Sequence, residues 1–203
     1  MKKKTVAVKN KTLPIEKLLA FINQTEGLKR ELRHSWLSNG RRESVAEHTW
    51  RMAIMALVLA PHLKKKPDMV TLLKMILIHD LPEVYAGDRA VWKKKQSNKH
   101  QNEKEALQRL IRALPSETKE EMMRLWVNFE TCQTIESKMA NALDKMEVLI
   151  QHNQAPIKTW NTTERTPKYS TEYGYEYCTF DEVVRQMRLL VKKQTARKLR
   201  MKA

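Results

Sequence analysis

Apolar residues recur along most of the chain at spacings of three and four positions, the period of helices that bury one face. No run alternates between apolar and polar residues for long enough to predict a strand. The pattern predicts helices over residues 13–23, 45–60, 68–80, 101–114, 116–129 and 134–152, and a C-terminal helix that opens near residue 180. The weakest helical pattern falls in residues 24–42, 89–100 and 153–178, which are expected to be irregular. Without an internal repeat or a marked boundary, the sequence predicts one all-α domain, a single helical bundle.

Local signals for helix ends support these limits. Ser44 and Glu47 fit a capping box, in which each side chain bonds the other residue's backbone N–H, and residues 179–182 fit a second one. Ser116 is expected to cap the helix that it precedes. Pro61 is expected to end one helix. Pro67 suits the first position of the next helix, because the N–H group that proline lacks is not needed there.

The charge of the chain is strongly positive, with 39 basic and 23 acidic residues among 203 and a formal net charge of +16. Much of the excess lies at the ends. Residues 1–11 carry five lysines and residues 192–203 carry six basic residues, with no acidic residue in either segment. We therefore expect basic tails over 1–12 and 192–203 around a domain over 13–191. Such tails are usually solvated, and nucleic-acid binding stays open as an alternative use for them.

Neither a membrane segment nor a disulfide framework is indicated. The longest strongly apolar run is residues 52–60, far short of the roughly 20 residues that a spanning helix needs. No signal-peptide pattern follows the first lysines. Cys132 and Cys178 stand in no metal-binding or redox spacing. The expectation is a cytoplasmic protein without a membrane partner.

His79 and Asp80 end the run of residues 72–78, which is apolar except for Lys74. Burying an imidazole and a carboxylate is costly unless they are paired or coordinated. For this dipeptide alone, the simpler interpretation is a histidine with an ordinary hydrogen bond and an aspartate that caps the following turn.

Two further polar residues lie on apolar helix faces. His48 shares a face with Met52 and Met55, and Asp144 is flanked one turn away on either side by small or apolar residues. Lys145 is expected to point away from Asp144, because neighbours on a helix diverge by about 100°. Each residue taken singly is explained as part of the core. Taken together, His48, His79, Asp80 and Asp144 form a mixed nitrogen and oxygen set suited to one divalent ion such as Mn²⁺, Co²⁺, Fe²⁺, Zn²⁺ or Mg²⁺.

These residues resemble those of a known family. Residues 43–53 (Glu-Ser-Val-Ala-Glu-His-Thr-Trp-Arg-Met-Ala), 77–83 (Leu-Ile-His-Asp-Leu-Pro-Glu), 87–88 (Gly-Asp) and 143–147 (Leu-Asp-Lys-Met-Glu) are similar in order and content to the HD-domain metal-dependent phosphohydrolases, in particular to their 5′-deoxynucleotidase branch. The likeness covers roughly residues 15–190. It implies an HD-domain helical bundle with one ion held by His48, His79, Asp80 and Asp144.

The resemblance implies further roles. Asp80 and Glu83 are expected to be catalytic, with Glu83 moving a proton beside the ion. Arg33, Trp36 and Asp88 are expected to bind the nucleotide, at its phosphate, its sugar or base, and its sugar respectively. From the residues alone, Glu83 is equally explained as a carboxylate favoured at a helix start. The alternatives for the other three are a turn residue for Asp88, a surface salt bridge for Arg33 and a core aromatic for Trp36.

The expected activity is hydrolysis of nucleoside 5′-monophosphates, with deoxyribonucleotides favoured. Ser35, Pro82 and Arg89 depart from the branch's usual residues near the pocket, so the resemblance bears on hydrolysis more than on substrate choice. The alternatives are a phosphodiesterase or phosphatase for cyclic nucleotides, alarmones or other small phosphate esters, and a nucleic-acid-binding adaptor. The family resemblance also leads us to expect a homodimer.

Overall fold

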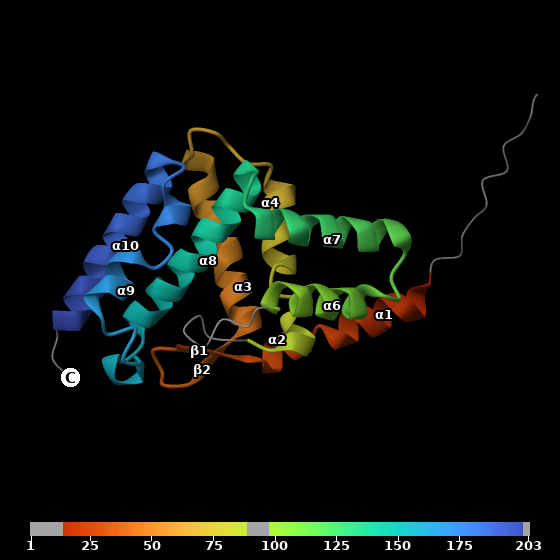
Figure 1. The fold of residues 1–203 in the computed structure, drawn as a ribbon, viewed down its shortest axis with the longest axis horizontal. Coiled ribbons are helices and arrows are strands. Elements are labelled where there is room, and N and C mark those ends of the chain that lie inside the picture. Colours follow the sequence, from red (N-terminus) through yellow and green to blue (C-terminus); the bar gives the residue numbers. More distant parts are fainter. Residues whose placement is uncertain (1–13, 89–97, 201–203) are drawn as a thin grey trace, which may run out of the picture.

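A computed structural model describes residues 14–88 and 98–200, which form a helical bundle with one small sheet (Figure 1). The helices are α1 (Ile15–Gln24), α2 (Gly27–Arg30), α3 (Val45–Leu59), α4 (Met69–Ile78), α5 (Glu83–Ala86), α6 (Lys99–Ile111), α7 (Ser116–Thr131), α8 (Ile135–Gln154), α9 (Pro167–Glu172) and α10 (Glu182–Arg200). Three short 3-10 helices are η1 (Ala60–His62), η2 (Ile157–Thr159) and η3 (Glu176–Cys178). The strands β1 (Leu32–Trp36) and β2 (Arg42–Ser44) pair in antiparallel fashion. The predicted all-α class is confirmed.

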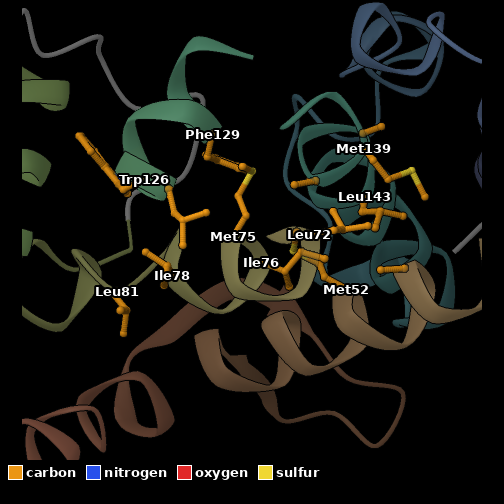
Figure 2. Close-up of a cluster of buried hydrophobic side chains, with 14 of the residues drawn as sticks. Met52, Leu72, Met75, Ile76, Ile78, Leu81, Trp126, Phe129, Met139 and Leu143 are labelled. Atoms are coloured by element: carbon orange, nitrogen blue, oxygen red, sulfur yellow. The ribbon is translucent and has the colours of Figure 1, made fainter. Parts of the chain in front are cut away.

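Helix α8 is the centre of the packing. It contacts α3, α4, α7 and α10, and in Figure 1 it crosses the molecule with α9 and α10 on one side and α3 and α4 on the other. Apolar side chains from four helices fill the space between them, including Met52 of α3, Met75 of α4, Trp126 of α7 and Leu143 of α8 (Figure 2). The elements that carry the candidate ligands therefore meet around one core.

Several predicted helix ends are confirmed and others are shifted. The capping box of Ser44 and Glu47 is present at the start of α3. The helix expected over 68–80 begins one residue later, because Asp68 is its N-cap and accepts the N–H of Thr71, so Pro67 lies before the helix. It ends at Ile78.

Three other predicted ends are wrong. Ser116 is the first residue of α7 rather than its cap. The second predicted capping box is replaced by Asp181, whose side chain accepts the N–H of Val183, while Glu182 pairs with Arg185. The helix expected from 101 starts at Lys99. The rest of the loop predicted over 89–100 lies almost wholly outside the described residues.

The segment expected to be irregular over 24–42 contains α2 and the β1–β2 hairpin. The strands are stabilised by hydrogen bonds from side chains, and their sequences show no alternation of apolar and polar residues. Arg42 donates from its guanidinium to the carbonyls of Leu32 and Arg33, and Gln151 of α8 donates to the carbonyl of Trp36. This pairing fixes β1, and with it Arg33, against α8.

The basic C-terminal segment is helical as far as Arg200, since α10 continues through it and Thr195 is fully buried. The division into tails and a central domain stays a prediction. None of the described helices combines the length and the hydropathy needed to cross a bilayer.

Candidate metal centre

His79 is placed by the end of α4. Its backbone N–H bonds the carbonyl of Met75 as the helix closes, and its Nδ1 lies 2.7 Å from the carbonyl oxygen of Ile76. Because Nδ1 donates to that carbonyl, the Nε2 atom is the side of the ring that can accept or coordinate. Asp80 follows in the turn before Pro82, so the helix end, rather than a helix face, brings the two side chains to one point.

His48 is oriented in the same way by a carboxylate. It is fully buried on α3, and its Nδ1 lies 2.5 Å from Oε2 of Glu147 on α8. The Nε2 atoms of His48 and His79 are both buried, and neither makes a well-aligned hydrogen bond with a described residue, although a carboxylate oxygen lies close to each. Two buried imidazole nitrogens that face carboxylates without well-aligned hydrogen bonds form a pattern that a metal ion resolves.

The carboxylates of Asp80 and Asp144 lie against these nitrogens. Asp80 Oδ2 is 3.1 Å from His79 Nε2 and 3.9 Å from His48 Nε2, and Asp144 Oδ1 is 3.3 Å from His48 Nε2. Ligand atoms that share one ion at about 2.1 Å lie roughly 3.0–3.4 Å apart. The residues present therefore fit a divalent ion, with two nitrogen and two oxygen donors.

Opposite charges keep these carboxylates ionised. Although burial opposes ionisation, the nearby His79 and Arg33 hold the pKa of Asp80 well below its usual range. Burial would lower the pKa of His48, but the carboxylates of Glu147 and Asp144 raise it to about 9. The site is thus a concentrated cluster of charges before any ion enters.

Lys145 is where the sequence analysis is wrong. Its Nζ lies 2.7 Å from Oδ2 of Asp144, so it pairs with the aspartate that it was expected to point away from. Burial opposes its charge, but Asp144 outweighs it and raises the pKa of Lys145 above the usual range. The four-carbon stem bends the ammonium back across the angle between neighbouring helix positions.

Two buried glutamates were missed as site residues. Glu147 is fully buried, with Oε1 3.5 Å from Arg51 Nη1, and Glu43 is 1% exposed on β2. Burial and the neighbouring Glu147 raise the pKa of Glu43 to about 7. Glu147 lies one helical turn after Asp144, and that spacing was the signal that could have identified it.

Glu83 lies at the start of α5 and faces the same cavity as His79, Asp80 and Asp144. The cavity has a volume of about 240 Å³. Burial, with the charges of Asp80 and Asp88, raises the pKa of Glu83 to about 10, and its Oε2 has no hydrogen-bond partner among the described residues. The predicted proton-transfer residue therefore lies in the cavity beside the candidate ligands.

Of the three predicted nucleotide-binding residues, Arg33 lies nearest to the cluster. Its Nη1 is 3.4 Å from Asp80 Oδ2 and its Nε is 3.6 Å from Glu43 Oε2. Asp88 follows Gly87, and burial raises its pKa, with Asp80 contributing. Trp36 is half-buried at the end of β1 and is not among the described residues that line the cavity. Their roles towards a substrate stay predictions.

The arrangement matches a known family along most of the chain. A family model described as HD domain matches residues 25–187. The chain belongs to the HD domain family. Its HD domain is 33% identical over 140 residues to the human protein named 5′-deoxynucleotidase HDDC2, an alignment that covers 68% of this chain and 67% of the relative. The Dictyostelium discoideum protein of the same name is 33% identical over 141 residues, covering 66% of this chain and 74% of the relative.

A solved structure has a similar fold. A crystal structure titled as a predicted metal-dependent phosphohydrolase from Magnetospirillum magnetotacticum superposes with a TM-score of 0.80 at 26% identity, covering 91% of this chain and 94% of that one. This chain is accordingly a phosphohydrolase of a metal-dependent family, and its candidate metal-binding residues include His48, His79, Asp80 and Glu147.

Proposed function

We propose that this protein hydrolyses the phosphomonoester bond of nucleoside 5′-monophosphates, releasing the nucleoside and inorganic phosphate. One observation carries the proposal: two buried Nε2 atoms without well-aligned hydrogen bonds to described residues converge with the carboxylates of Asp80 and Asp144. The name 5′-deoxynucleotidase, borne by relatives about one-third identical to this chain, supports a nucleotide as the substrate.

A single divalent ion would be held by His48, His79, Asp80 and Asp144. When bound, such an ion lowers the pKa of a coordinated water and polarises a phosphoryl oxygen. The mixed nitrogen and oxygen donors suit Mn²⁺, Co²⁺, Fe²⁺ or Zn²⁺ better than Mg²⁺, which prefers oxygen ligands alone. Glu147 and the carbonyl of Ile76 hold the imidazoles with Nε2 turned to the ion site.

The remaining residues supply proton transfer and charge. Glu83, whose raised pKa keeps it protonated near neutral pH, donates that proton from its carboxyl group to the leaving oxygen. Arg33 lies close enough to Asp80 to reach a phosphate bound at the same point. We further propose that Asp88 contacts the sugar of the nucleotide and that Trp36 contacts its sugar or base, as the family resemblance implies.

The experiment is release of inorganic phosphate from ribo- and deoxyribonucleoside 5′-monophosphates with Mn²⁺ or Co²⁺ added. Turnover by the wild type and its loss in Asp80→Ala are expected. The panel extends to cyclic nucleotides, guanosine polyphosphates and other small phosphate esters. Turnover confined to those compounds would replace the nucleotidase proposal with a phosphodiesterase or another phosphatase. If no compound of the whole panel is turned over faster by the wild type than by Asp80→Ala, the proposal of a phosphohydrolase at this site is wrong.

Three wider expectations stay predictions: the cytoplasmic location, the homodimer, and an interaction of the basic ends with nucleic acid. The last is tested by the salt dependence of binding. Its slope against salt concentration should flatten when residues 1–11 and 192–203 are removed, because each phosphate neutralised releases counterions.

A further inference from the structure

Lys145 lies in the cavity beside the candidate ligands and is held there from two sides. Its Nζ bonds Asp144 Oδ2 at 2.7 Å and lies 5.8 Å from the centre of the Tyr177 ring. The opposite side of its stem is covered by Gly174, where an added Cβ would come within 2.3 Å of the Cβ of Lys145. Gly174 also has a φ of +63°, which favours glycine. The turn between α9 and η3 therefore needs glycine both for its backbone conformation and for its close approach to Lys145.

The cavity needs a cation of this kind. Asp80 and Asp144 face it as ionised carboxylates, and a phosphate dianion entering there meets their negative charge. The lysines among its described lining residues are Lys99 and Lys145. Lys99 has a side chain 62% exposed and pairs with Glu103 at 3.3 Å, whereas the side chain of Lys145 is 25% exposed. Lys145 is therefore the more enclosed of the two.

An ammonium group has three N–H donors, of which Asp144 takes one. The others can donate to a second oxygen close to the same carboxylate. We propose that Lys145 binds a phosphoryl oxygen of the substrate, and of the phosphate product, next to the ion that Asp144 helps to hold. The inference rests on the proposed function for the identity of the substrate, but it concerns phosphate binding and can be measured without turnover.

The alternative is that Lys145 only neutralises Asp144. The two roles differ in what they affect: neutralising a ligand alone changes only the affinity for the metal, whereas binding phosphate also changes the affinity of the metal-saturated protein for phosphate. Sequence adjacency to Asp144 explains neither the close fit of Gly174 nor the enclosure of the ammonium.

The test compares wild type, Lys145→Met and Lys145→Arg, with Lys74→Met as the control. Lys74 forms an exposed pair with Glu121, so its variant removes the same charge away from the cavity. Metal affinity is measured by chelator competition, and the binding of inorganic phosphate to the Mn²⁺-loaded proteins by calorimetry. Lys145→Met should weaken phosphate binding roughly 10- to 100-fold, as for a lost charged hydrogen bond, and Lys145→Arg should recover part of it.

Because Lys145 pairs with Asp144, phosphate binding is compared with every variant saturated with Mn²⁺, so that a change in metal affinity does not enter the comparison. Where the wild type turns over nucleotides, Lys145→Met should raise KM more than it lowers kcat. Phosphate binding that is unchanged in Lys145→Met, or that weakens only in step with metal affinity, would overturn the inference while leaving the nucleotidase proposal intact. Absence of nucleotide turnover in the wild type would overturn the nucleotidase proposal and leave the phosphate-binding role of Lys145 to be decided by the calorimetry.

A measurement on the wild-type protein covers the case in which a variant does not fold. Phosphate with Mn²⁺ should slow reductive methylation of Lys145, read by mass spectrometry, and should leave Lys74 unaffected. Equal labelling of Lys145 with and without phosphate would count against the proposal.

Discussion

At the scale of single residues, the two candidate imidazole ligands are fixed by different partners. Nδ1 of His48 faces the carboxylate of Glu147, and Nδ1 of His79 faces the carbonyl of Ile76. A carboxylate partner raises the basicity of the ring and holds its tautomer more strongly than a neutral carbonyl does. The affinity for the ion should therefore depend on Glu147 as well as on the imidazole that it holds.

Glu147→Gln is predicted to lower metal affinity about 10- to 100-fold, the usual effect of losing such a partner. The amide keeps the size of the side chain and removes its charge. Chelator competition measures the effect, with the exposed Glu121→Gln as the control for losing a carboxylate. An affinity equal to that of the wild type would mean that Glu147 serves only the core.

Glu83→Gln is predicted to lower kcat by about 100-fold or more at nearly unchanged metal affinity, because the glutamine can neither give nor take the proton. The measurement is phosphate release under saturating nucleotide and Mn²⁺. A kcat within a few fold of the wild type would mean that Glu83 only stabilises the start of α5 and transfers no proton.

The sequence selected His48, His79, Asp80 and Asp144 by combining the cost of burying polar residues among apolar ones with the resemblance to the HD-domain family. The structure brings all four together, and their role as ligands stays a proposal. Lys145 was misjudged because helix geometry fixes the direction of a Cβ but not that of a flexible ammonium four carbons further out.

At the scale of elements, the turn between α9 and η3 packs against α8 where Gly174 lies close to the side chain of Lys145. Gly174→Ala is predicted to lower the free energy of unfolding by more than Gly40→Ala does. Both glycines have positive φ, but a Cβ at Gly40 meets nothing within 4 Å, whereas one at Gly174 overlaps Lys145. Gly40→Ala should therefore show the backbone penalty alone, about 1–2 kcal/mol.

Chemical denaturation of the two variants measures this difference. An equal loss of stability in both would show that the turn moves aside and that Gly174 does not fix the position of Lys145.

The long helices were predictable because their apolar period persists over several turns, as in α3 and α8. The β1–β2 hairpin was not, since β1 (Leu-Arg-His-Ser-Trp) contains no run of apolar and polar alternation. It is held instead by contacts from distant residues. Gln151 bonds the carbonyl of Trp36, and Ser35 lies 3.3 Å from His152. Short elements such as α9 are likewise stabilised by packing that a local pattern does not record.

At the scale of the whole molecule, an apolar stripe runs along the outer face of α3. Trp50 is 64% exposed, and Ile54, Leu57 and Val58 follow it at helical spacing with exposures of 42%, 52% and 60%. A homodimer is expected on the family resemblance, and we predict that light scattering after size exclusion gives twice the chain mass.

If this stripe is the interface, Ile54→Glu should shift the protein to a monomer at the same concentration, because it places an unpaired charge in an apolar contact. Leu190→Glu, which changes an exposed residue of α10, is the matched control. A monomeric wild type would contradict the expected homodimer.

The most direct test of the metal centre is the metal content of the protein after loading with Mn²⁺ and dialysis, measured for the wild type, His48→Ala, Asp144→Ala and the surface control Glu121→Ala. The account predicts about one ion per chain in the wild type and the control, and strongly reduced content in the two ligand variants, since each removes one of four donors. Wild-type content in both His48→Ala and Asp144→Ala would contradict it.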